Sequence, residues 1–127
     1  MNILVVDDKQ AILTSLDALL TAHGYYVDTA CNGLDASEKS QNKIYDLLII
    51  DHLMPIMNGI QLVKKLRQIK EYVATPIIFM TTQGQDSVQA ECDSALFSAL
   101  IDKPINEDKL LSLIESHQSS NTRYLSL

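Results

Sequence analysis

The 127-residue sequence has no tryptophan, only two cysteines, and no long run of apolar residues. Its longest uninterrupted apolar runs are about four residues, whereas a membrane-spanning helix needs about 20. The first of these runs, residues 3–6, is followed at once by two aspartates, which excludes the pattern of a secretory signal peptide. Cys31 and Cys92 are too few for a disulfide framework and lack the spacing of a metal site. We therefore expect a cytoplasmic protein with reduced thiols and no membrane segment.

Positive charge is scarce as well. Ten lysines and arginines stand against sixteen aspartates and glutamates, which gives a formal net charge of -6 at pH 7. This balance argues against direct binding to nucleic acid or to an anionic membrane surface. The length fits one domain. We expect that domain over residues 1–118 and a loosely held C-terminal tail over 119–127; the N-terminal Met and this tail favour a complete chain.

Short apolar runs alternate with helical patterns along the chain. Apolar runs predict strands at 3–6, 25–30, 47–50, 77–80 and 99–101. Helical spacing of apolar residues predicts helices at 10–23, after Gly33, and at 58–69, 87–97 and 106–117. This alternation predicts an α/β fold, a doubly wound five-stranded parallel sheet with helices on both faces. We expect the flavodoxin-like strand order 2-1-3-4-5.

Polar residues follow the strands at the edge of the sheet where their carboxyl ends meet. They are Asp7, Asp8, Asp51, Thr81 and Lys103. Ligands of open α/β sheets bind at this edge, so we expect these side chains to converge in one pocket. Three neighbouring carboxylates repel one another and need compensating cations. Lys103 supplies one, and Mg²⁺, which prefers oxygen ligands, suits the rest of the site.

A carboxylate beside Mg²⁺ and a lysine is equipped for phosphoryl transfer. The glycine-rich motifs of dinucleotide and P-loop nucleotide binding are absent, as is the nucleophile elbow of acyl transfer. A small phosphohydrolase with Asp51 as nucleophile is an alternative. It is disfavoured because Leu53 stands two residues after Asp51, where a second acid is needed to protonate the leaving group.

Several motifs occur in a specific order and spacing. They are residues 3–8, the segment 46–59 with Asp51, Met54-Pro55 and Asn58-Gly59, then Thr81 and Lys103-Pro104. The spacings between Asp8, Asp51, Thr81 and Lys103 are 43, 30 and 22 residues. Together these motifs resemble the receiver domain of two-component response regulators. The resemblance covers about residues 1–118.

The resemblance implies a role for each acid. Asp51 is expected to be the phosphoacceptor, taking a phosphoryl group from a histidine of a sensor kinase or a phosphotransfer protein. Asp8, Asp51 and the backbone carbonyl of Leu53 are expected to bind Mg²⁺ directly, and Asp7 through water. The protein is then no enzyme in the usual sense, because it catalyses only its own phosphorylation and dephosphorylation.

The resemblance also implies how the site responds. Thr81 is expected to be the switch hydroxyl and Lys103 the counter-ion of the phosphoryl group, with a cis Lys103-Pro104 bond. We expect a single-domain response regulator whose phosphorylation switches binding to a downstream protein that the sequence does not identify.

Three features of the sequence depart from the family pattern. Leu100 replaces the usual aromatic residue, Leu96-Phe97 replaces a small pair, and Thr82 follows the switch hydroxyl. Our hypothesis is that phosphorylation is retained while its propagation to the usual output face weakens or takes another route. The alternative is a receiver-like interaction module that works without phosphorylation.

Other interpretations of single residues remain open. Asp7 or Asp8 is also a suitable N-cap for the helix that follows. Thr82 offers a hydroxyl that competes with Thr81 for the switch role. We interpret His52 as a side chain at the rim of the crevice, without a metal-binding role.

Overall fold

The computed structural model describes residues 1–84, 86–88 and 94–125. The strands are β1 (Asn2–Val6), β2 (Tyr26–Ala30), β3 (Leu47–Asp51), β4 (Ile77–Thr81) and β5 (Ala99–Asp102). The α-helices are α1 (Gln10–Ala22), α2 (Gly33–Asn42), α3 (Gly59–Leu66) and α5 (Glu107–Leu125), and two short 3-10 helices are η1 (Lys70–Tyr72) and η2 (Ser94–Leu96). All five predicted strands are therefore present.

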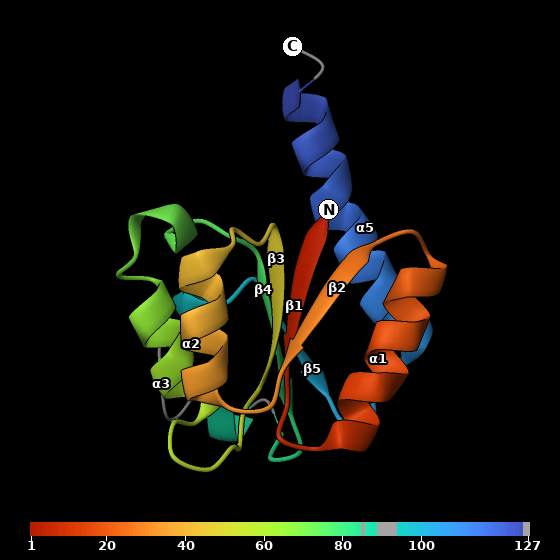
Figure 1. Ribbon diagram of the computed structural model, residues 1–127. Helices are drawn as coiled ribbons and strands as arrows, with labels where there is room; N and C mark the ends of the chain where they lie inside the picture. The colour runs from red at the N-terminus through yellow and green to blue at the C-terminus, as the bar shows by residue number, and fades with distance from the viewer. Residues whose placement is uncertain (85, 89–93, 126–127) are drawn as a thin grey trace.

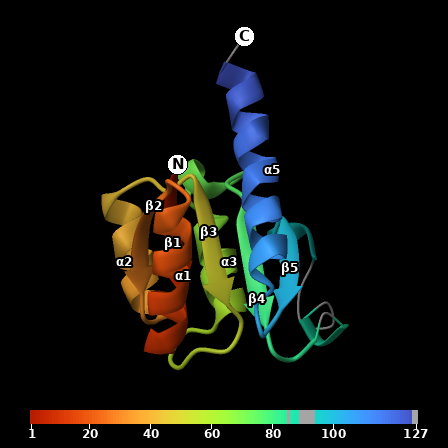
Figure 2. The ribbon, with the colours of Figure 1, turned by 90° about the vertical axis from the view of Figure 1, so that its right-hand side faces the viewer.

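The strands form one parallel sheet in the order β2-β1-β3-β4-β5, which confirms the predicted topology. Helices α2 and α3 cover one face of this sheet, and α1 and α5 cover the other (Figures 1 and 2). The register pairs Asp51 of β3 with Met80 of β4, and Thr81 of β4 with Asp102 of β5. The ends of β3, β4 and β5 are therefore level with one another, so the residues that close them share one edge.

Two apolar clusters hold the helices to the sheet. Because side chains alternate along a strand, Leu4 and Val6 of β1 pack toward α2 and α3, whereas Ile3 and Val5 pack toward α1 and α5. The two central strands β3 and β4 are buried along their whole length, as expected for a parallel sheet covered on both faces. Strand β2 lies at the edge and is less buried, as its more polar sequence predicts.

Helix α3 is shorter than the prediction of 58–69. It ends at Leu66, and Ile69 has an extended backbone (φ -91°, ψ 127°). The side chain of Arg67 accounts for the early end, because its guanidinium draws the following turn inward. It donates to the carbonyl oxygens of Tyr72 (2.8 Å), Thr75 (2.7 Å) and Leu96 (2.9 Å). Apolar spacing does not encode these backbone contacts.

Helix α5 is longer than the prediction of 106–117. It continues to Leu125, so most of the expected tail is helical, and its last part extends beyond the sheet (Figures 1 and 2). Residues 118–125 include no glycine or proline, and so no local signal stops the helix. Within the described ranges, no helix has both the length and the apolar character to cross a membrane.

The predicted helix over 87–97 falls partly outside the described residues. Residues 86–88 are helical, and the 3-10 helix η2 follows at Ser94–Leu96. Residues 85 and 89–93 lie outside the described part of the chain.

The loop between β3 and α3 contains a backbone conformation that suits its residue poorly. Ile56 has a φ of 71°, and its side chain is 79% exposed. Left-handed backbone costs an ordinary residue about 1–2 kcal/mol, and more crowding is expected for a β-branched one. We expect Ile56→Gly to raise the free energy of unfolding by about 0.5–1 kcal/mol, because the relief of the left-handed backbone strain exceeds the extra conformational entropy that glycine loses on folding.

Urea unfolding measures this change. Ile44→Gly is the matched control, because Ile44 is also an exposed loop isoleucine but does not have a positive φ. The control should lose about 0.5–1 kcal/mol through the added freedom of the unfolded chain. Equal losses in both variants would contradict the strain at Ile56.

Candidate functional site

The five residues predicted to converge all lie at the carboxyl edge of the sheet. Asp7 and Asp8 follow β1, Asp51 closes β3, Thr81 closes β4, and Lys103 follows β5. The Lys103-Pro104 peptide bond is cis, as the resemblance implied.

The Lys103 ammonium joins two of the acids. Its Nζ lies 2.6 Å from Oδ2 of Asp7 and 3.0 Å from Oδ1 of Asp51, and only 8% of the lysine side chain is exposed. Both carboxylates are buried. Such short, charge-assisted contacts fix the carboxylates relative to each other, even though they come from different strands.

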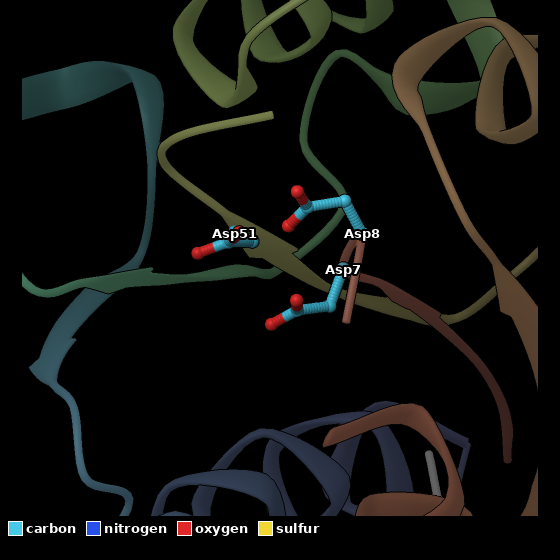
Figure 3. A group of neighbouring side chains, drawn as sticks. All are labelled: Asp7, Asp8 and Asp51. Atoms are coloured by element: carbon cyan, nitrogen blue, oxygen red, sulfur yellow. The ribbon is translucent and has the colours of Figure 1, made fainter. Parts of the chain in front are cut away.

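Asp7, Asp8 and Asp51 form one acidic cluster (Figure 3). Each offers a carboxylate oxygen, and these three oxygens lie within 4.8 Å of one another. Asp8 is the accessible member, with 30% of its side chain exposed. Lys103 and the exposed Lys9, whose Nζ lies 3.9 Å from Oδ1 of Asp8, set two ammoniums against three carboxylates, so the cluster keeps an excess of negative charge.

The surroundings shift two pKa values. Burial raises the pKa of the Asp51 carboxyl above its ordinary value; the hydrogen bond from Lys103 opposes this shift, and the charges of Asp7 and Asp8 reinforce it. Burial alone lowers the pKa of Lys103, but its hydrogen bonds to Asp7 and Asp51 outweigh burial and raise it. Lys103 is therefore firmly protonated, while the ionised form of Asp51 is incompletely compensated.

One oxygen of Asp51 lacks a partner. Its Oδ2 is buried and accepts no hydrogen bond among the described residues. An ionised oxygen in this position is costly unless a cation or donor meets it. A hard divalent cation between Asp51 and the accessible Asp8 fits this need, and Mg²⁺ prefers such oxygen ligands.

The other predicted ligands differ in how the structure presents them. Both oxygens of Asp7 are already engaged, Oδ2 by Lys103 and Oδ1 by the backbone N–H of Lys9 at 2.9 Å. This arrangement suits an indirect role for Asp7. The side chain of Leu53 is 47% exposed, and the ligation of a cation by its carbonyl stays a prediction.

The capping interpretation of the aspartates is wrong. The N-cap of α1 is Lys9, without a side-chain capping bond, so neither Asp7 nor Asp8 occupies that position. Both acids are thus available to the cluster.

The two threonines at the end of β4 differ in exposure. Thr81 is fully buried, whereas Thr82 is exposed. The Thr81 hydroxyl accepts a hydrogen bond from the backbone N–H of Gln83 at 2.9 Å and lies 3.0 Å from Nδ1 of His52.

His52 is buried, with 1% of its surface exposed, so its interpretation as a rim residue was wrong. The signal was present in the sequence. Strand alternation places residue 52 on the face opposite Asp51, and the register carries it next to Thr81.

Gly59 lets the loop after β3 return to the site. A Cβ at this position would lie 2.1 Å from the carbonyl oxygen of Asp51 and 2.8 Å from Cε1 of Phe79. The Gly59 N–H donates to the carbonyl of His52 at 2.8 Å, and Asn58 and Gln61 form a capping box at the start of α3. The absence of a side chain at 59 is therefore a condition for this loop geometry.

The fold and the acidic pocket define a doubly wound α/β domain that carries a buried aspartate ion-paired to a lysine. A family model for the response regulator receiver domain matches residues 3–115. The chain therefore belongs to the response regulator receiver domain family.

Relatives and solved structures agree. The transcriptional regulatory protein DltR of Streptococcus agalactiae is 34% identical over 125 residues, which cover 97% of this chain and 55% of that protein. The chemotaxis protein CheY4 of Vibrio cholerae is 33% identical, with a TM-score of 0.84 over 91% of this chain and 96% of that one. TrrA of Thermotoga maritima, in complex with Mg(2+)-BeF, is 31% identical, with a TM-score of 0.81 over 91% and 97% of the two chains.

These likenesses carry the general properties of the family. Receiver domains act in two-component systems, interact with histidine kinases or phosphotransfer proteins and with downstream targets, and bind Mg²⁺ at an acidic pocket. The chain spans about half the length of curated relatives such as DltR (55%) and the regulatory protein PhoB of Rhizobium meliloti (51%).

We expect Mg²⁺ to stabilise the folded protein, because only the folded chain gathers the acidic cluster. At tenfold excess over its dissociation constant the ion adds about 1.4 kcal/mol, or a rise in Tm of about 5 °C for a domain of this length. Thermal unfolding in Mg²⁺ and in EDTA measures the shift. Asp8→Asn should lose most of it, whereas Glu38→Gln, an exposed acid on α2, should keep it. Equal shifts in both variants would place the ion elsewhere.

We expect Asp51→Asn to stabilise the metal-free protein at neutral pH, on the order of 1 kcal/mol. The folded-state pKa of Asp51 is raised, so its destabilising effect is absent below the ordinary aspartate pKa of about 4 and grows as pH rises through the raised pKa. Lys103 keeps Asp7 as its partner in the variant.

Urea unfolding in EDTA at pH 7 and at lower pH tests this sign. The difference between variant and wild type should shrink as the pH falls toward about 4. A variant less stable than the wild type at pH 7 would show that the Lys103–Asp51 pair outweighs the burial of charge.

Proposed function

We propose that the protein is an Mg²⁺-dependent phosphoacceptor switch of a histidine-to-aspartate phosphorelay, with Asp51 as the acceptor. The observation that carries the proposal is the position of Asp51. One of its oxygens pairs with Lys103, and the other is buried beside Asp7 and Asp8 and has no hydrogen-bond partner in the part of the chain that the structure describes. This carboxylate is held in place, poorly compensated, and adjacent to the accessible side of the cluster.

The residues divide the chemistry among them. The Asp51 carboxylate attacks the phosphorus of a phosphohistidine; the O–P bond forms as the N–P bond breaks, and the electron pair returns to the imidazole nitrogen. Lys103, already 3.0 Å from Asp51, pairs with a phosphoryl oxygen, and the Thr81 hydroxyl donates a hydrogen bond to another. Asp8, Asp51 and the Leu53 carbonyl hold Mg²⁺, with Asp7 acting through water. When bound, Mg²⁺ supplies positive charge to the transferring phosphoryl group.

The same proposal covers partners and location. A sensor histidine kinase or histidine phosphotransfer protein supplies the phosphoryl group, and phosphorylation changes binding to a downstream protein, with no direct contact to nucleic acid or membrane. The formal net charge of -6 supports the last point. We place the protein in the cytoplasm, and we propose that its only catalysis acts on its own aspartyl phosphate.

Incubation with Mg²⁺ and phosphoramidate, followed by intact mass spectrometry, tests the proposal. The wild type should gain one phosphoryl group, and Asp51→Asn should gain none. Asp102→Asn is the matched control, because Asp102 is an exposed acid at the end of β5 on the same edge of the sheet. EDTA should prevent the modification in every variant.

Each alternative predicts a different result. An adduct that survives Asp51→Asn would assign phosphorylation to another residue. A folded wild type without any adduct would favour an interaction module that works without phosphorylation. Turnover of many equivalents of a phosphomonoester would favour a phosphohydrolase.

A further inference from the structure

The hydroxyl of Thr81 is not free in this structure. It accepts from the Gln83 N–H and hydrogen-bonds with Nδ1 of His52 at 3.0 Å, and both Thr81 and His52 are buried. A hydroxyl has one hydrogen and two lone pairs, so these contacts use most of its capacity. Among the described residues, none of its hydrogen bonds goes to Asp51, whose Oδ2 remains without a partner.

The register of the sheet explains this contact. Asp51 pairs with Met80, and the backbone N–H of His52 donates to the Met80 carbonyl at 2.8 Å. Since side chains alternate along a strand, Asp51 points into the acidic cluster and His52 to the opposite face. Thr81 follows Met80 and shares the face of His52. The reacting residue and the residue that holds the hydroxyl are thus neighbours in the chain.

The His52 ring leads away from the site through two further rings. Its centroid lies 5.5 Å from that of Phe79, at an interplanar angle of 47°. Phe79 in turn stacks on Phe97, with 5.0 Å between centroids and an angle of 8°. Such pairs are favourable at these separations and depend on ring geometry. The contacts form a continuous series from Thr81 to the segment between η2 (Ser94–Leu96) and β5.

Because Phe79 is closely packed, a displacement of the His52 ring must also move the Phe79 ring. Phe79 is fully buried, and its Cε1 is one of the atoms with which a Cβ on Gly59 would clash, at 2.8 Å. Across the sheet it pairs with Leu100, the position where the family pattern has an aromatic residue. In this chain the aromatic contact of Phe79 is made by Phe97 instead.

We propose that His52 is a positioning residue that holds the Thr81 hydroxyl in the resting state. Phosphorylation of Asp51 exchanges the Thr81–His52 hydrogen bond for one from Thr81 to the phosphoryl group. The released ring shifts against Phe79, and the stack carries the change to Phe97. This inference rests on the proposed function, because the exchange requires a phosphoryl group on Asp51.

Binding of beryllofluoride in the presence of Mg²⁺, followed by NMR titration, tests the exchange. His52→Phe keeps a ring against Phe79 but removes the hydrogen bond, so it should bind beryllofluoride about fivefold more tightly, the factor expected for one neutral hydrogen bond. His52→Asn offers a polar atom near the position of Nδ1 and should stay close to the wild-type affinity. His23→Phe, at the exposed histidine that forms the C-cap of α1, is the control and should change nothing. Unchanged or weaker binding by His52→Phe would overturn the proposal.

A second measurement follows the ring resonances themselves rather than the affinity. In the wild type, ring resonances of His52 and Phe97 should both shift on beryllofluoride binding; in His52→Asn the shift at Phe97 should be largely lost while binding persists. Binding without a shift at His52 would overturn the inference and leave the proposed function intact. Absence of binding by the wild type, at Mg²⁺ concentrations that stabilise it, would overturn both.

Discussion

The contact of one ammonium with two buried carboxylates is the interaction on which the site depends. Lys103 follows β5 at one edge of the sheet, whereas Asp7 follows β1, with β3 and β4 between them. The Lys103 side chain therefore reaches across the carboxyl ends of β3 and β4. It offsets part of the repulsion between the carboxylates, which burial strengthens. It offsets only part, and the remaining negative charge is what makes the pocket attractive to a divalent cation.

Alternation along the strands separates two tasks. Every second side chain of β3 and of β4 lies on the sheet face covered by α1 and α5, and Asp51 lies on this face, in the acidic cluster. The side chains between them lie on the face covered by α2 and α3, and His52, Thr81 and Phe79 belong to this second set. The proposed phosphorylation and the proposed response to it thus lie on opposite faces of the sheet, although Asp51 and His52 are adjacent in the chain.

The features that the sequence predicts depend on the spacing of apolar residues and on which residues follow each strand. Short apolar runs and the aspartates that follow them predict the strands and the acidic edge, because both depend on burial and on where a strand ends. The strand order followed from the usual topology of a doubly wound sheet of this size. The early end of α3 was not predictable, since it depends on carbonyl contacts of Arg67 with residues up to 29 positions away. The length of α5 was missed for a different reason, because a polar composition was taken for an absence of structure.

The burial of His52 was within reach of the sequence. Strand alternation places residue 52 on the same buried face as Leu48 and Ile50. The register, in which Asp51 pairs with Met80, then places it beside Thr81. What the local pattern could not supply is the hydrogen-bond partner of His52, because a histidine next to an acidic cluster is ordinarily assigned to solvent or metal. The structure shows that its Nδ1 lies 3.0 Å from the Thr81 hydroxyl.

The close packing around Gly59 determines which substitutions the protein tolerates at this position. A methyl group there would meet both the carbonyl oxygen of Asp51 and the ring of Phe79, so both would have to move. A substitution at this position would disturb both sides of the sheet in a single step. The geometry of the pocket would then be lost although every acidic and basic side chain of the pocket were intact.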